Sequence, residues 1–322
     1  MRRREFTILA GMSVAWPFMA RAQKPAKIPH VVIISPAGLP PDRRYREQLR
    51  ELGYVEGRNI QLEVRDAGGH SDRLPALAEQ LVQEGGVDVI ATISLPAAIA
   101  AHKATQAIPI VAFIAADPVA SGLAKSLAHP GGNVTGIAIF AEETNVKRVE
   151  LMREVAPLAV RVAMIATQIG LTQQNLASTQ EAARRFGFAL EIISLDDPNN
   201  IARTLTPERL EGFDAFVVPP DAVLPLHEGE VVKLIGLSNK PAIYSESDWA
   251  ANGGLISFGP DFSEASQHWV SQLDRVLKGE KPNDLPFDRP TKFYLSINLR
   301  TARAMGIELP PTLLARADKV IE

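Results

Sequence analysis

The chain has 322 residues, of which 46% are hydrophobic and 22% charged, and its formal net charge is −3. This composition excludes a disordered chain and favours two globular domains of similar size. The absence of cysteine excludes disulfides, thiolate metal sites and cysteine nucleophiles, and the acidic balance without a Lys/Arg cluster argues against nucleic acid as a partner.

The first 22 residues have the features of an export signal. A basic head at Arg2 to Arg4 precedes a short apolar stretch at 7–19, and Ala20 to Ala22 form a small-x-small cleavage site. Arg3 and Arg4 fit the twin-arginine pattern, with Sec export and an uncleaved anchor as the alternatives. We therefore expect a signal peptide over 1–22, cleavage near Ala22 and a periplasmic protein.

Strands and helices alternate through the first half of the chain. Apolar runs rich in β-branched residues predict strands, and segments with apolar residues at helical spacing predict helices. Strands are predicted at 30–35, 59–67, 87–93 and 108–114, and helices at 42–52, 74–84 and 97–106. Continuous apolar runs are typical of parallel strands that are covered on both faces, so this half is predicted to form βαβ units.

The second half repeats the first. The segment 86–91 closes an apolar run and leads to Pro109, and the segment 212–217 does the same and leads to Pro241. Strands are predicted from 160 and at 189–195, 213–218 and 242–245, with helices at 172–186 and 226–237. One α/β unit is therefore present twice, and two such lobes would enclose a cleft between them.

Three segments are predicted to pass between the lobes. The first is the glycine-rich segment 130–136, which precedes an apolar strand at 137–140. The second follows a strand at 254–258 and enters a helix at 262–277, and the third is the proline-stiffened segment 282–290. The predicted fold class is α/β, with two Rossmann-like lobes of parallel sheets on a three-segment hinge. Lobe 1 would comprise 29–139 and 260–286, and lobe 2 would comprise 140–259 and 287–322.

Sequence signatures of common enzymes are missing. Ser35 to Gly38 follow the first strand where a dinucleotide-binding protein would have GxGxxG, and neither GxxxxGK[ST] nor GxSxG occurs. The six histidines form no i, i+4 pair, so we expect no metal site and no cofactor. A two-lobed racemase- or hydrolase-like enzyme nevertheless stays open as one alternative for the function.

Candidate ligand-binding residues follow the strands, because open α/β sheets bind ligands beyond the carboxyl ends of their strands. In lobe 1 the candidates are Ser35, Ser94, Leu95, Pro96 and Asp117. Ser94 and Asp117 each precede a proline. They either cap a helix and do nothing more, or mark helix starts whose free N–H groups bind an anionic group.

In lobe 2 the candidates are Gln168, Asp221, Tyr244 and Glu246. Asp221 or Glu246 would accept a hydrogen bond from a ligand ammonium group, although Glu246 also fits the first turn of a helix. Tyr244 and Phe258 are the aromatic residues predicted to face the cleft, whereas Phe113 fits the core of a strand. Helix starts in one lobe and carboxylates in the other predict a polar, zwitterionic solute.

Four separated blocks resemble one known family. They are LGYVEGRNI from Leu52, DPVASGLAKSLAHPGGNVTG from Asp117, GGLISFGPD from Gly253 and the tail from Pro290. In this order they resemble the ABC-transporter substrate-binding proteins that include tryptophan/tyrosine-binding members, over essentially the whole mature chain. Relatives commonly have a glycine- or threonine-rich loop where this chain has Ile93 to Pro96.

The resemblance implies a type I periplasmic-binding-protein fold, no catalysis and delivery of a captured solute to a membrane permease. The expected solute is an amino acid or an aromatic or other small carboxylate compound. We expect a monomer that closes its lobes on this solute and has no nucleic-acid partner. A ligand-binding partner of a membrane sensor is a further alternative.

Overall fold

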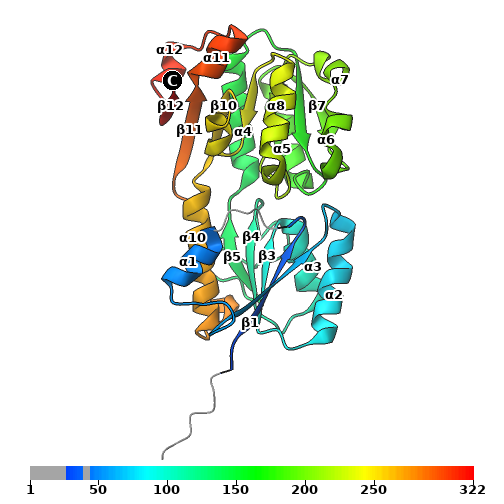
Figure 1. Ribbon diagram of the computed structural model, residues 1–322, viewed down its shortest axis with the longest axis vertical. Coiled ribbons are helices and arrows are strands. Elements are labelled where there is room, and N and C mark those ends of the chain that lie inside the picture. The colour runs from blue at the N-terminus through cyan, green and yellow to red at the C-terminus, as the bar shows by residue number, and fades with distance from the viewer. Residues whose placement is uncertain (1–26, 39–43) are drawn as a thin grey trace, which may run out of the picture.

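The computed structural model of the protein describes residues 27–38 and 44–322, so the predicted signal peptide lies outside the described residues. Two lobes, each built around one β-sheet, follow one another along the long axis of the molecule (Figure 1). Among the described residues, the helices are all too short or too polar to cross a membrane.

Lobe 1 contains a five-stranded parallel sheet with the strand order β2-β1-β3-β4-β5. Its strands are β1 (His30–Ser35), β2 (Gln61–Asp66), β3 (Val89–Ile93), β4 (Ile110–Ile114) and β5 (Val134–Ala138). Strands β1, β3, β4 and β5 are almost wholly buried, while β2 at the edge is partly exposed. The apolar runs predicted this burial, because strands covered on both faces have no polar side.

Helices cover both faces of the lobe 1 sheet. They are α1 (Arg44–Glu51), α2 (Leu74–Glu84), α3 (Leu95–Ala104) and α10 (Phe262–Leu277), with a 3₁₀ turn η1 (Ser71–Arg73) before α2 and another, η4 (Pro282–Asp284), after α10. Alternate residues of a strand point to opposite faces, so Val32 packs toward α2 and α3 whereas Val31 packs toward α1 and α10. The helix that arrives last in sequence, α10, therefore completes the first lobe.

Lobe 2 contains a seven-stranded sheet with the order β12-β11-β10-β9-β8-β6-β7. Its strands are β6 (Arg161–Ala166), β7 (Ala189–Ser194), β8 (Ala215–Val217), β9 (Ala242–Tyr244), β10 (Ile256–Pro260), β11 (Phe293–Asn298) and β12 (Lys319–Ile321). Every pairing is parallel except that of β10 with β11. The predicted fold class is confirmed, and the tail adds two strands for which the sequence analysis made no prediction.

The helices of lobe 2 also form two layers. They are α4 (Ala141–Val155), α5 (Gln173–Arg185), α6 (Ile201–Thr204), α7 (Pro207–Glu211), α8 (Glu228–Leu237), α9 (Ser247–Ala251), α11 (Leu299–Met305) and α12 (Pro311–Leu314), with 3₁₀ turns η2 (Pro198–Asn200) and η3 (Leu224–His227). Val217 of β8 packs toward α4 and α5, while its neighbour Phe216 packs toward α8 and α9. The period-2 alternation of buried strands thus builds a core on each face.

The chain passes between the lobes three times, after β5 into α4, after β10 into α10, and before β11 (Figure 1). The prediction that 130–136 forms the first passage is wrong, because Val134 to Gly136 lie inside β5 and pair with Ile110 to Ala112. Gly136 has a φ of 144°, and a Cβ there would lie 1.9 Å from the carbonyl oxygen of Ala112. The glycine at this position therefore allows the two strands to approach closely, whereas the sequence pattern had predicted a passage between the lobes.

The repeated Gly-Xaa-Asp segments have the same structural role in both lobes. Asp88 accepts a hydrogen bond from the backbone N–H of His30 at 2.9 Å. Asp214 accepts two, from the N–H groups of Val160 and Arg161, both at 2.8 Å. Each aspartate thus fixes the beginning of the first strand of its own lobe, β1 or β6. This explains the internal repeat as a folding device rather than as part of a site.

Candidate ligand-binding site

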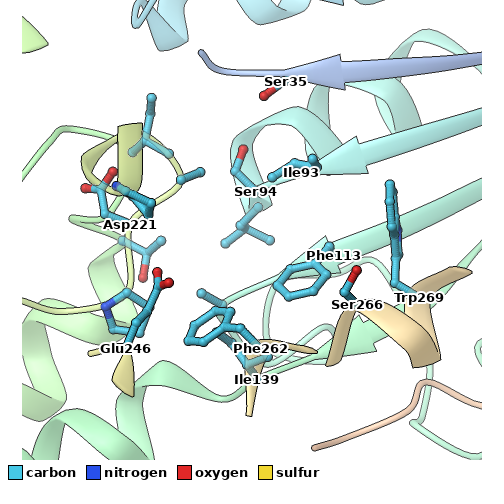
Figure 2. A pocket seen from close by; sticks show the side chains of 18 of the residues that line it. Ser35, Ile93, Ser94, Phe113, Ile139, Asp221, Glu246, Phe262, Ser266 and Trp269 are labelled. Atoms are coloured by element: carbon cyan, nitrogen blue, oxygen red, sulfur yellow. The ribbon is translucent and has the colours of Figure 1, made fainter. Parts of the chain in front are cut away.

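A cavity of about 390 Å³ lies between the lobes at the carboxyl ends of the parallel strands (Figure 2). Lobe 1 contributes residues from β1, β3, β4, α1, α3 and α10, and lobe 2 contributes the loops after β6, β8 and β9 together with α5 and α8. The side chains that face each other across it are the lobe 1 residues Ser35, Tyr45, Ile93, Ser94, Leu95, Phe113, Ile139, Phe262, Ser266 and Trp269 and the lobe 2 residues Ile169, Thr172, Asn175, Asp221, Glu228 and Glu246.

Five of the nine predicted residues line this cavity, namely Ser35, Ser94, Leu95, Asp221 and Glu246. Ser94 has a φ of 103°, which is rare for a residue with a side chain, and its Oγ accepts a hydrogen bond from the N–H of Ala97 at 3.3 Å. Strained backbone of this kind persists where the surrounding structure fixes it, and it often occurs at functional sites. Ser94 therefore caps helix α3, as one of the two interpretations predicted, and it also lines the cavity.

Four predicted residues do not line this cavity. Pro96 and Gln168 line a neighbouring space of about 450 Å³ between α3 and the loop after β6. Asp117 orders its own loop, because its carboxylate accepts hydrogen bonds from the N–H groups of Val119 and Ala120. Tyr244 is buried on the α8 and α9 face of the sheet, where its ring packs 5.2 Å from that of Trp249.

An aromatic wall on lobe 1 was not predicted from the sequence. The rings of Phe113 and Phe262 stack at a centroid distance of 6.4 Å with their planes 17° apart. Trp269 meets Phe113 edge-on at 6.4 Å, and its indole Nε1–H donates to the carbonyl oxygen of Val111 at 3.1 Å. Figure 2 shows these rings and Ser266 on one side of the cavity. A ligand ring placed here would find a rigid apolar surface.

The sequence did contain a signal for this wall. Phe262, Ser266 and Trp269 stand at i, i+4 and i+7 on α10, which places them on one face of the helix. Phe113 comes about 150 residues earlier in the sequence, on β4. The three rings come together only because α10 packs against lobe 1. No local sequence pattern predicts that packing.

Asp221 already has four hydrogen-bond donors from the protein. Its carboxylate accepts from the N–H and Oγ1–H of Thr167 at 2.9 and 2.8 Å, and from the N–H groups of Val223 and Leu224 at 2.8 and 3.3 Å. Burial raises the pKa of Asp221, while these four hydrogen bonds act in the opposite direction. Because a carboxylate offers about four acceptor positions, this geometry favours a role for Asp221 in ordering the loops around the cavity.

Two further acidic residues of lobe 2, Glu228 and Glu246, line the cavity. Burial raises the pKa of Glu228, whose Oε1 accepts a hydrogen bond from Asn252 at 2.9 Å. Behind Glu246, the buried Arg148 donates from Nε to the carbonyl oxygen of Phe258 at 2.8 Å. Burial lowers the pKa of Arg148 to about 9, and the negative charge of Glu246 opposes that shift. The lobe 2 side of the cavity therefore carries carboxyl groups, with the guanidinium of Arg148 close to one of them.

Within residues 27–38 and 44–322, no group of three or more His, Asp or Glu side chains is arranged to hold a metal ion. The cavity therefore combines an aromatic wall with hydroxyls on one lobe and carboxylates on the other. Such a space suits a small molecule with an aromatic ring and a polar end.

Comparison with known proteins agrees with this geometry. The family model of ABC transporter substrate binding proteins matches residues 31–321. A protein named tyrosine-binding protein, from Clostridioides difficile (strain R20291), is 26% identical over 261 residues, which are 81% of this chain and 74% of that protein.

Two solved structures show the same type I periplasmic-binding-protein fold. One is an ABC domain from Streptococcus pneumoniae in complex with L-Trp, which is 25% identical with a TM-score of 0.76 over 91% of this chain and 99% of that chain. The other is a conserved domain protein from Vibrio cholerae, which is 24% identical with a TM-score of 0.78 over 91% of this chain and 100% of that chain. The family match covers nearly all of the described residues. The chain belongs to the ABC transporter substrate-binding protein family.

Proposed function

We propose that the protein is the solute-binding component of an ABC importer, that it captures an aromatic amino acid between its lobes and that it delivers this solute to a membrane permease. The observation that carries the proposal is the cavity whose aromatic wall on lobe 1 faces carboxylates on lobe 2 (Figure 2). The volume of about 390 Å³ lies in the range usual for small-molecule sites.

The aromatic wall accounts for the ring of the proposed solute. Phe113, Phe262 and Trp269 hold one another in place, so a ring entering the cavity meets a surface that loses little freedom on binding. An aliphatic solute would leave part of this surface uncovered. A relative named for tyrosine and a similar structure in complex with L-Trp support the same choice of ring.

The polar groups account for the two charges of an amino acid. Glu228 and Glu246 line the lobe 2 side and attract an ammonium group. Helix α3 begins at the cavity-lining residues Ser94 and Leu95, and the positive end of its dipole favours a carboxylate, although Pro96 has no N–H and the N–H of Ala97 is already bonded to Ser94. A zwitterion that spans the cavity would therefore satisfy both lobes.

The proposed mechanism is capture by closure. The solute contacts both lobes at once, so it favours the arrangement in which the lobes are together, and the three passages act as the hinge. A shift from mostly open to mostly closed needs a preference of about 5.5 kcal/mol, which a micromolar ligand, bound with about −8.2 kcal/mol, can supply. The closed form then docks on the permease. We further propose that this takes place in the periplasm after removal of residues 1–22, with the protein a monomer.

A thermal-shift screen of residues 23–322 tests the proposal. L-tryptophan, L-tyrosine and L-phenylalanine are compared with L-leucine, L-glutamate and benzoate. An aromatic amino acid at 100 times its Kd is expected to add about 2.7 kcal/mol to the free energy of unfolding. Stabilisation by benzoate or by the aliphatic compounds alone would contradict the proposed solute class, and conversion of a bound amino acid to a product would favour the enzyme alternative.

A further inference from the structure

Asn175 occupies an unusual place in the wall of the cavity. It lies in the first turn of α5, where its backbone N–H donates to the Oγ1 of the capping residue Thr172 at 3.2 Å. The residue lines the cavity and yet has no solvent-exposed surface. Its side-chain amide is therefore removed from water, although the residue belongs to the wall of the space that the solute would fill.

The hydrogen bonds of this amide fix its orientation. Nδ2 faces two carbonyl oxygens, that of Ala115 at 3.4 Å and that of Gly170 at 3.5 Å. A rotation by 180° would place Oδ1 against two acceptors, so the nitrogen must occupy this position. Oδ1 is then the atom that needs a donor. In the part of the chain that the structure describes, no group donates to it.

The same amide joins the two lobes. Ala115 follows β4 in lobe 1, whereas Asn175 and Gly170 belong to lobe 2. The contact between Nδ2 and the Ala115 carbonyl therefore exists only when the lobes are together. Closure buries an amide whose oxygen has no protein donor, and a buried acceptor without a donor is unfavourable. A solute that donates a hydrogen bond to this oxygen would remove that cost.

The ammonium group of the solute is the donor that the arrangement favours. The rings of the aromatic wall belong to lobe 1, whereas the acceptors Asn175 and Glu246 belong to lobe 2. A solute whose ring lies on the wall turns its other end toward lobe 2. Asp221 in the same lobe already accepts four hydrogen bonds, so it competes little for this donor.

We propose that Asn175 is a specificity-determining residue whose Oδ1 accepts a hydrogen bond from the ammonium group of the solute and thereby makes closure depend on that group. This inference rests on the proposed capture of an aromatic amino acid and assigns one of its contacts. It predicts that the protein distinguishes an amino acid from the same molecule without its amino group, and that Asn175 supplies part of this difference.

Isothermal titration tests the inference with two probes, L-tryptophan and indole-3-propionate, which lacks the amino group. Asn175→Leu keeps the approximate size of the side chain and removes the acceptor. If a melting curve shows that Asn175→Leu does not fold, Asn175→Ala takes its place in the comparison. The matched control is Ser178→Ala on the same helix, whose hydroxyl donates to the Asn175 carbonyl at 3.1 Å.

In Asn175→Leu, the Kd for L-tryptophan is expected to rise about 10- to 100-fold, because hydrogen bonds to charged groups are the stronger ones. Its Kd for indole-3-propionate should rise much less, because this probe has no ammonium group to donate, and Ser178→Ala should retain L-tryptophan. An unchanged Kd for L-tryptophan in Asn175→Leu, or an equal loss of both probes, would overturn the inference alone. A wild-type protein that binds neither L-tryptophan nor L-tyrosine would overturn the proposed function and this inference with it.

Discussion

Phe262 differs from most aromatic residues of the protein in that its ring borders the cavity while it stacks on a neighbour. A second pair, Phe258 and Phe293, stacks in nearly the same way, with centroids 6.3 Å apart and planes at 19°, but lies outside the cavity. The two pairs therefore separate the contribution of a ring to binding from its contribution to packing.

Phe262→Ala is expected to weaken binding of an aromatic amino acid about 10-fold, because a well-placed aromatic pair contributes roughly 0.5 to 1.5 kcal/mol beyond the area it buries. Phe293→Ala is the matched control and should leave the Kd unchanged. Isothermal titration with L-tryptophan measures both. Equal Kd values for the two variants would show that the solute ring does not lie on this wall.

The position and the hydrogen-bond partners of individual side chains explain why the sequence predicted only some of the residues that line the cavity. The rule that ligands bind beyond the carboxyl ends of strands placed Ser35, Ser94 and Glu246 in the cavity wall. The same rule misplaced Tyr244, since the side chains of a strand alternate and this one points into the core. For Asp221, the sequence showed a carboxylate but not the four donors that surround it.

At the scale of elements, the beginning of β6 depends on one carboxylate. Hydrogen bonds from the N–H groups of Arg161 and Val160 hold the pKa of Asp214 below its usual value. A group whose pKa is lower in the folded state stabilises the fold above its unfolded pKa of about 3.9, and this stability disappears as the pH falls through the folded-state pKa.

Asp214→Asn is therefore expected to lower the free energy of unfolding by about 1 kcal/mol at pH 7, a hydrogen-bond value discounted for solvent screening. The difference from the wild type should shrink as the pH falls below about 4, where the wild-type carboxylate also becomes protonated. Urea titrations at pH 7 and pH 3 measure it, with the exposed Asp72→Asn as the control. A difference that stays constant between the two pH values would argue against this role of the charge.

The first passage between the lobes depends on close contact between β4 and β5. Gly136→Ala would place a methyl group 1.9 Å from the Ala112 carbonyl oxygen and is expected to lower the free energy of unfolding by about 3 kcal/mol or more. Gly132→Ala is the matched control, because a Cβ there would meet nothing within 4 Å. Thermal melting compares them, and similar melting temperatures would refute the packing argument.

Element prediction succeeded where burial and propensity agree. The segments that became β1, α2 and α10 were predicted with the bounds that the structure has, because each combines strong periodicity with a clear beginning and end. The segment 130–136 was misassigned to a passage between the lobes, since glycines also occur in such crossovers and only the partner strand β4 shows why Gly136 must be a glycine. The sequence around such a glycine does not reveal a tertiary contact of this kind.

At the scale of the whole molecule, the two lobes are alike in fold and different in chemistry. The repeat supplies two sheets whose carboxyl ends face a common cavity, and its aspartates serve folding. Lobe 1 adds α10 and with it the aromatic wall, whereas lobe 2 adds the acidic residues. The two lobes therefore offer unlike surfaces to the cavity, as the proposed closure around a zwitterionic solute requires.

Two passages of the hinge are also joined directly. Arg289, on the passage before β11, lies 3.9 Å from the ring centre of Phe140, which ends the first passage, and pairs with Glu143 at 2.9 Å. Phe140 has a φ of 44°, in the left-handed region. Movement of one passage is therefore expected to move the other, which favours rotation of the lobes as rigid bodies.

Small-angle X-ray scattering of residues 23–322, without solute and with saturating L-tryptophan, tests capture by closure most directly. Capture by closure predicts a smaller radius of gyration with the solute, because the solute stabilises the arrangement in which both lobes contact it. A radius of gyration that stays the same under conditions where titration shows the site to be full would contradict it.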